Sequence, residues 1–597
     1  MTTFDWIVLG GYLALLVGIG SWQRKRASGS AEDFFASGRR LPWYLAGTSM
    51  IAASFASDTP LFVSGLVREH GIWRNWLWWG NAISLILTVF FFSRLWRRSR
   101  VLTEVEITEV RYGGRSAAVL RGFKAVYWGL LFNAFATGAW SVTGLRKVFQ
   151  STLEMDPTAA IIACSLIACA YSVLSGYWGV VATDCFQFVL AIFGSLACAY
   201  YAVSAAGGWD AMLAQIPAAK LNFVPSMTQD SDPAVDNPMF TWFLSFVLVQ
   251  WWAWKNTDGG GVLVQRMASC KNERHAVWAT LWYQVFHTAV RGWPWIVVAL
   301  ASIVIVPDSA LPVKVGTANA PDHEAAYAVI IRTVLPAGLR GLLVAWFLAE
   351  FMSSINSQTN WGSSLLVNDF YKRFLNPAAT PARQVLAGRF ATVVVMAGAM
   401  TTAFWTGDIA QSFELVLTGT AGIGVVVALR WLWWRVNVWT EAIALVLSPL
   451  ATVFYAPVLK PILSVLGLPP DDRMVKLIAI VLVSVLPALA VTLLSAPDRD
   501  ETLCAFYRRV RPPGPGWRRI AALCPEVTSD LSLWRILALW LGCVAAVYGL
   551  MYGVYALLFA RAFGFAATAL SLVLLAVIVR ETGKDRGDDE AAIAKTM

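Results

Sequence analysis

Oxygen-bearing side chains crowd one apolar stretch of this 597-residue chain, "FLAEFMSSINSQTNWGSSLLVNDFYKRF" at 347–374. The stretch holds one carboxylate and seven hydroxyl or amide groups before its polar end: Glu350, Ser353, Ser354, Asn356, Ser357, Gln358, Thr359 and Asn360. Hydroxyl, amide and carboxylate groups this dense are not expected on a helix that faces only lipid. Because such groups are costly in lipid, we expect them to belong to a binding site.

Two other apolar runs are interrupted near their middle. The first contains "SFASDTP" at 54–60, where Pro60 removes a backbone donor and disfavours helix at Thr59. The second contains Gly259-Gly260-Gly261 after Lys255 and Asp258, and three glycines favour an unwound segment. A proline kink and tight glycine packing are the alternatives. Two interrupted helices, five helices apart, are typical of inverted-repeat secondary transporters whose site lies at the interruptions.

The composition places these segments in a membrane. The chain is 57% hydrophobic and only 14% charged, whereas soluble domains carry roughly 25% charged residues. Repeated apolar runs of roughly 20 residues indicate a polytopic, all-α membrane protein.

The apolar runs predict fifteen helices, with one short extracellular helix included in the ninth range. The expected ranges are 4–22, 43–66, 74–97, 122–149, 157–175, 178–206, 238–267, 276–306, 324–369, 386–406, 409–435, 438–462, 474–495, 533–558 and 561–580. The net charge of +10 comes from short basic clusters between runs, such as "QRKR" at 23–26 and "RLWRRSR" at 94–100. The positive-inside rule then predicts an external amino terminus and an internal carboxyl terminus.

The runs group into five regions. They are a leading helix and loop (1–30), a first five-helix repeat (31–206), an extracellular loop (207–237), a second repeat (238–435) and peripheral helices (436–597) with a cytoplasmic loop at 496–531.

Four motifs carry a family resemblance. They are "AEDFFASGRRLPWYLAGTSMIAASFASDT" (31–59), "SGYWGVVATDCFQF" (175–188), "VQRMASCKNERHA" (264–276) and "MSSINSQTNWGSSLLVNDFYKRF" (352–374). Their order and content resemble the sodium:solute symporter family, which includes sodium/galactose, sodium/proline and sodium/sialic acid transporters. The resemblance implies a leucine-transporter-like core of two inverted five-helix repeats, with one helix before it and about four after it. It also implies sodium-driven symport by alternating access.

The resemblance also implies a sodium site. Alignment on "GRRLPW" carries the two backbone carbonyls of the family's site to Ala52 and Phe55. The remaining ligands fall on the carbonyl of residue 350 and the hydroxyls of Ser353 and Ser354.

Glu350 departs from the family pattern, which has a small residue at this position. Three interpretations stay open. The carboxylate adds negative charge to the sodium site, or takes up a proton as the coupling ion, or pairs with Lys255 or Arg340.

Asp184 matches the family's aspartate on the fifth core helix, which belongs to a second sodium position or to sodium release. Asn356 and Ser357 are the expected partners of Asp184 in such a role. The alternative is a structural aspartate that holds helices together through Thr183 or Gln187.

The resemblance places polar solute contacts at the two interruptions, with Ser54, Asp58 and Thr59 at the first and Asp258 at the second. Two weaker candidates lie elsewhere, Asn81 and, on the tenth core helix, Glu414. We expect a sugar or other polyol-like solute first and an amino acid or amine second.

Other classes of protein fit less well. A sensor would need a kinase partner, because 582–597 is too short for a kinase domain. Metalloprotease and hydrolase motifs are absent, so we do not expect an enzyme, and the broken helices favour alternating access over a channel. We therefore expect a multi-pass protein of the plasma membrane, the bacterial inner membrane in particular, with sodium and a small solute as its ligands.

Overall fold

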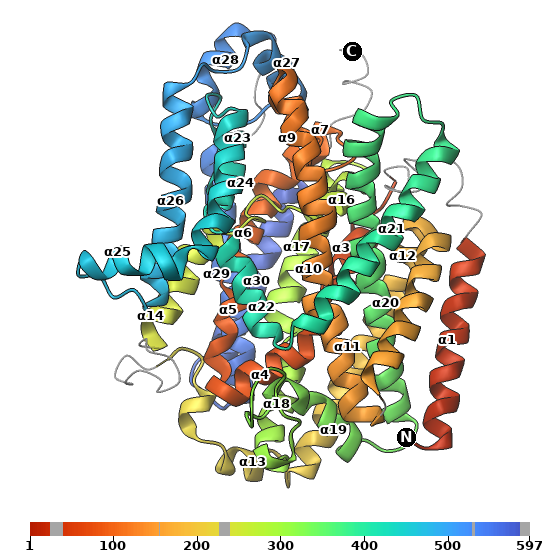
Figure 1. Cartoon of the computed structure of the whole chain (residues 1–597). Coiled ribbons are helices and arrows are strands. Elements are labelled where there is room, and N and C mark those ends of the chain that lie inside the picture. Colours follow the sequence, from red (N-terminus) through yellow and green to blue (C-terminus); the bar gives the residue numbers. More distant parts are fainter. Residues whose placement is uncertain (24–39, 155, 226–238, 528–531, 585–597) are drawn as a thin grey trace.

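The computed structural model describes residues 1–23, 40–154, 156–225, 239–527 and 532–584, and these residues form a helical bundle without named strands (Figure 1). By length and composition, six of the described helices can cross a membrane, or up to nine if each bent pair counts as one span. Fifteen helices were predicted. Helices that carry polar residues, such as the one holding Glu350, do not pass the apolarity test although they lie within the bundle.

The leading helix α1 (Thr3–Gln23) packs against α12 and α20 at the side of the bundle (Figure 1). Its Asp5 carboxylate accepts the backbone N–H groups of Gly338 and Gly341 at 2.7 and 2.9 Å. These amides lie at the start of α20 (Leu339–Leu365), where backbone donors have no helical acceptor. A Cβ at Gly341 would meet the Asp5 carbonyl oxygen at 2.5 Å, so the glycine permits this contact.

The first predicted repeat begins with the broken pair α3 (Trp43–Ala52) and α4 (Thr59–His70). The next span is bent by 41° between Ile72–Trp79 and Ala82–Ser99. The third span is helical from α9 (Gly114–Val126) through η5 (Tyr127–Phe132), α10 (Asn133–Thr137), η6 (Gly138–Val142), α11 (Thr143–Val148) and η7 (Phe149–Leu153). Helix α12 (Pro157–Ala205) is continuous where two helices were predicted. Its 49 residues are long enough for two spans of roughly 20 residues.

The second predicted repeat also begins with a broken helix. α14 (Met239–Leu244), η9 (Ser245–Gln250) and α15 (Trp251–Ala253) are separated from α16 (Val262–Ser269) by an unwound segment. The helices that follow are α17 (Glu273–Val285), η10 (Phe286–Val290), α18 (Trp293–Ile305), α19 (Ala326–Val334), α20 with η13 (Leu366–Leu375), α21 (Pro381–Trp405), α22 (Ile409–Gly419) and α23 (Ile423–Leu432). α22 and α23 meet at an angle of 48°, a bend that was not predicted.

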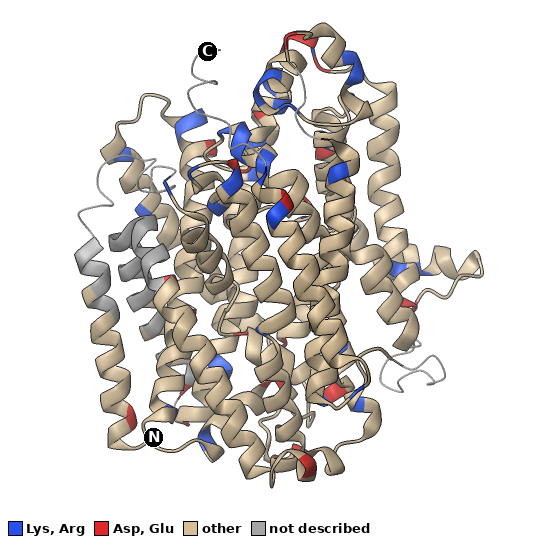
Figure 2. Ribbon diagram, turned by 180° about the vertical axis from the view of Figure 1, so that it is seen from behind, with Lys and Arg blue, Asp and Glu red and all other residues tan. Residues whose placement is uncertain are grey.

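The remaining long helices surround this core. They are α24 (Val438–Val453), which bends by 73° into η14 (Tyr455–Leu459) and α25 (Lys460–Val465), then α26 (Arg473–Leu494), α29 (Leu533–Leu558) and α30 (Gly564–Gly583). The short helices α27 (Asp500–Val510) and α28 (Arg518–Leu523) lie at the end of the bundle opposite the amino terminus. Figure 2 shows that many of the Lys and Arg residues gather toward that same end.

Candidate functional site

Both predicted interruptions are present in the structure. In the first, the Ser54 and Phe55 amides bond back to the carbonyls of Ile51 and Ala52 at 3.0 and 2.9 Å, so the chain turns tightly and leaves helix α3. Pro60 lies in the first turn of α4, where its missing N–H costs nothing. Asp58 precedes α4 without capping it, and its buried Oδ1 has no hydrogen-bond partner. Thr59, the third predicted solute contact here, is half-buried.

A buried arginine of the seventh core helix donates hydrogen bonds to the first interruption. Arg291, which follows η10, donates from Nη1 to the carbonyl oxygen and the Oγ of Ser54, the latter at 2.9 Å. Ser54 Oγ lies 3.1 Å from His287 Nδ1 and also donates to the Ile51 carbonyl at 2.7 Å. The segment between α3 and α4 is therefore tied to the second half of the chain.

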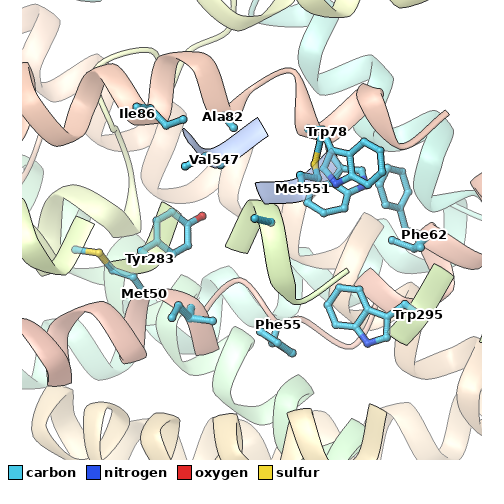
Figure 3. Packing of buried hydrophobic residues seen from close by; sticks show 14 of the residues in the cluster. Met50, Phe55, Phe62, Trp78, Ala82, Ile86, Tyr283, Trp295, Val547 and Met551 are labelled. Atoms are coloured by element: carbon cyan, nitrogen blue, oxygen red, sulfur yellow. The ribbon is translucent and has the colours of Figure 1, made fainter. Parts of the chain in front are cut away.

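Aromatic rings enclose the same place. Phe55 packs edge-on against Trp295 with 5.2 Å between ring centroids, and Trp78 lies nearby (Figure 3). The Arg291 guanidinium carbon lies 5.0, 5.5 and 5.9 Å from the ring centroids of Phe55, Trp295 and Trp78, within range of cation–π attraction.

Glu350 is fully buried, and neither predicted cationic partner reaches it. Its Oε1 accepts a hydrogen bond from Trp346 Nε1 at 3.1 Å, one turn earlier on α20, and its Oε2 has no hydrogen-bond partner. Lys255 instead donates to the Asn256 side chain, and Arg340 donates to the Leu335 carbonyl. The prediction of an ion pair with Lys255 or Arg340 is therefore wrong, because those side chains have nearer acceptors.

Ser353 and Ser354, the two serines whose hydroxyls were predicted to bind sodium, differ in their surroundings. Ser353 Oγ donates to Asp184 Oδ1 at 2.6 Å, whereas the buried Oγ of Ser354 has no hydrogen-bond partner. Ser354 thus offers a free oxygen on the same helical face as Glu350.

Asp184 connects three helices. Its Oδ2 accepts from Ser49 Oγ on α3 at 2.5 Å and from Arg266 Nη2 on α16 at 3.3 Å, while Oδ1 accepts from Ser353 on α20. Arg266 also donates to Ser357 at 3.1 Å. Asp184 and Ser357 therefore lie close together, and the Arg266 guanidinium lies between them and donates to both.

The other residues of the Asp184 prediction lie elsewhere. Asn356 is buried on α20, whereas the described partners of the Asp184 carboxylate are Ser49, Arg266 and Ser353. The Thr183 side chain lies outside the described residues. Gln187 donates to the Ala349 carbonyl at 3.4 Å, so it does tie α12 to α20.

The second interruption, Trp254–Gly261, borders a small cavity of about 40 Å³. Three acidic and three basic residues line it: Glu104, Asp258, Glu441, Lys124, Lys255 and Arg430. Asp258 Oδ2 accepts from Arg430 Nη2 at 2.6 Å and from Trp431 Nε1 at 2.9 Å. The Asp258 carboxylate is thus already neutralised by the protein.

Two further predicted solute contacts also have protein partners. Asn81, at the bend between α5 (Trp76–Trp79) and α6 (Ala82–Leu87), accepts from Gln250 Nε2 at 3.1 Å. Glu414 on α22 forms an ion pair with Arg74 at 2.9 Å. Of the six candidates, Ser54, Asp58 and Thr59 cluster at the first interruption.

Sequence reasoning did not single out Arg291, His287, Arg266 or Arg430. The signal was available for Arg291, because it lies within an apolar run, where a charged residue marks a functional position by default.

Comparisons with known proteins agree with this architecture. The model of the sodium:solute symporter family matches residues 34–443. The sodium/glucose cotransporter of Vibrio parahaemolyticus is 26% identical over 523 residues, which cover 84% of this chain and 92% of the relative. Sodium/glucose cotransporter 2 of Rattus norvegicus is 25% identical over 433 residues, covering 66% of this chain and 61% of the relative.

A solved structure shows the same fold. A substrate-bound, outward-open Na⁺-coupled sialic acid symporter aligns with a TM-score of 0.64 and 20% identity, over 83% of this chain and 99% of that chain. The fold is therefore the predicted helical core of two inverted five-helix repeats with added helices, in an integral multi-pass membrane protein. The chain belongs to the sodium:solute symporter family, whose members are transporters rather than enzymes.

Proposed function

We propose that this protein carries a small polar organic solute across the membrane together with sodium, by alternating access. A sugar or polyol is the favoured solute, since the similar proteins of Vibrio parahaemolyticus and Rattus norvegicus are named sodium/glucose cotransporters. The observation that carries the proposal is the contact of α20 with α3 and α12 beside the first interruption, through Ser353, Asp184 and Ser49.

The sodium ligands in this proposal are five oxygen atoms. They are the backbone carbonyls of Ala52, Phe55 and Glu350 and the hydroxyls of Ser353 and Ser354. The unpartnered Ser354 hydroxyl supports this assignment, because a buried polar atom without a partner costs free energy that a bound ion would offset. Asp184 takes part in sodium release, since a cation at Asp184 and Ser357 must first displace Arg266.

The cavity at the second interruption supports alternating access. Pockets that hold organic ligands usually measure roughly 300 Å³ or more, whereas this cavity of about 40 Å³ has room for a few waters. An organic solute could enter this cavity only if the ion pairs of Arg430 with Asp258 and Glu441 separated.

A proton-coupled symporter is the second candidate, and the unpartnered Oε2 of Glu350 is the observation that favours it. Uptake of a radiolabelled panel of sugars, polyols and amino acids into proteoliposomes separates the candidates. We expect an inward sodium gradient to drive uptake of a sugar or polyol. Uptake driven by a proton gradient and indifferent to sodium would refute sodium coupling and favour the role of Glu350 in proton transfer.

A further inference from the structure

We propose that Arg291 is the positioning residue that links solute binding to the sodium site. Its Nη1 donates to the Ser54 carbonyl, and its Nε donates to an oxygen atom of the solute. The inference rests on the proposed symport function and adds to it the residue through which the two ligands affect each other.

The Nη1 group of Arg291 restrains the backbone of the first interruption. Nη1 binds both the carbonyl and the hydroxyl of Ser54, and Nη2 lies 3.4 Å from His287 Nε2. Ser54 lies between Ala52 and Phe55, whose carbonyls are the proposed sodium ligands. The Ser54 carbonyl belongs to the peptide whose N–H, on Phe55, donates to the Ala52 carbonyl at 2.9 Å, so Arg291 restrains the backbone that carries these proposed ligands.

The third nitrogen of the Arg291 guanidinium, Nε, is available to a ligand. Its side chain is buried, with 3% of the residue exposed, and Nε has no hydrogen-bond partner. Among the described residues no carboxylate lies within ion-pair distance, although the charges of Asp58 and Glu350 act on it from farther away. Buried donors are almost always satisfied, so this N–H points to a ligand acceptor that is present during part of the cycle.

The surroundings define the chemistry of that ligand. The rings of Phe55, Trp295 and Trp78 lie beside the guanidinium, and Asp58 Oδ1 is a buried acceptor without a partner at the same interruption. A solute that accepts a hydrogen bond from Arg291 and donates one to Asp58 satisfies both atoms. A hydroxyl group does both, so a polyhydroxylated solute fits this pair.

Because Arg291 would contact the solute and also binds Ser54, next to the proposed sodium ligands, the binding energies of the two ligands depend on each other. When the solute occupies Nε, Arg291 loses side-chain freedom, and the Ser54 peptide is held in the geometry that sodium needs. Sodium in turn stabilises that geometry for the solute. Linkage requires each ligand to raise the affinity of the other by the same factor, which is typically about 5–150-fold.

The test measures both affinities in purified protein by equilibrium binding, with radiolabelled sodium and with the sugar or polyol identified by uptake. In the wild type we expect saturating solute to raise sodium affinity at least about fivefold. In Arg291→Gln, which loses the paired donors, we expect each ligand to bind with less than about a twofold effect of the other. Arg291→Lys keeps the charge and one donor, so we expect it to restore part of the coupling.

Arg68→Lys is the matched control. Arg68 is also a buried arginine that joins the first and seventh core helices, through the Ser302 and Val306 carbonyls and Asp308, but it lies at the far end of α4. We expect this variant to change thermal stability and leave the coupling factor intact. A coupling factor in Arg291→Gln equal to that of the wild type would overturn the inference. Absence of any sodium effect in the wild type would instead refute the proposed function.

Discussion

At the scale of single residues, the two adjacent serines of α20 contribute differently to sodium affinity and to stability. The Ser354 hydroxyl has no hydrogen-bond partner, whereas the Ser353 hydroxyl donates to Asp184. We therefore expect Ser354→Ala to raise the sodium concentration for half-maximal uptake at least about tenfold, since losing an interaction with a charged group costs about 1.5–3 kcal/mol. Its thermal stability should be close to that of the wild type.

Ser353→Ala should lose both sodium affinity and stability, because it also removes a donor from buried Asp184. Ser364→Ala is the control on the same helix, since its hydroxyl only bonds back to the Trp361 carbonyl. A sodium activation curve unchanged in the Ser353→Ala, Ser354→Ala double variant would show that the sodium ligands lie elsewhere.

Glu350 gives a second prediction at this scale. Glu350→Gln keeps the backbone carbonyl and removes the charge, so we expect sodium affinity to fall at least about fivefold, because a nearby charge in the protein interior contributes about 1 kcal/mol or more. The measurement is sodium binding by equilibrium dialysis at fixed pH. If sodium affinity holds while uptake loses its dependence on a proton gradient, the proton interpretation of Glu350 is correct instead.

The oxygen-rich face of α20 could be predicted from the sequence because residues three and four apart on a helix must share a face. The partners of Glu350 could not. They depend on where Lys255 and Arg340 find their nearest acceptors, and that follows from the packing of helices distant in sequence. Arg291 illustrates the same limit, since its bond to Ser54 spans 237 positions of the chain.

At the scale of elements, the second interruption depends on two glycines with positive φ angles. Gly259 has φ +99°, and a Cβ there would meet Thr88 Cγ2 at 2.8 Å and Met267 Cε at 2.9 Å. Gly261 has φ +62°, but its Cβ would have space, with Trp361 3.8 Å away.

We expect Gly261→Ala to lower uptake without abolishing it, because it adds backbone strain of about 1–3 kcal/mol at φ +62° and ψ −140°, a region that favours glycine, but no steric clash. Gly259→Ala adds steric clashes at a hinge between two helices, so we expect it to abolish uptake while the protein still reaches the membrane. Initial uptake rates normalised to protein in the vesicles provide the comparison. Equal rates in the two alanine variants would contradict the role of Gly259 in this account.

The interruptions themselves were predictable, since Pro60 and the glycine triplet act on the local backbone. The bends of 41°, 48° and 73° in other spans were not. The bend between α22 and α23 places Gly422 at φ +95° against Ser484 of α26, so its direction is tied to a helix 62 positions later in the chain.

At the scale of the whole molecule, helix content and membrane insertion follow from composition, whereas the fold was implied by the resemblance of the four motifs to the sodium:solute symporter family. The last two apolar runs form separate antiparallel helices, α29 and α30, in close contact. A Cβ at Gly553 would meet Thr568 Oγ1 at 2.3 Å, so this glycine lets the pair approach. The predicted orientation, with the amino terminus outside, rests on the basic residues that gather at the opposite end (Figure 2).

Symport requires that each ligand drive the other, and this is the central claim. Proteoliposomes with equal sodium and equal pH on both sides receive an inward gradient of the solute identified by uptake, and radiolabelled sodium inside the vesicles is counted over time. We predict that sodium accumulates above its equilibrium level while the solute gradient lasts, and that Ser354→Ala greatly reduces this accumulation. Solute entry without any net movement of sodium would contradict sodium-coupled symport by this protein.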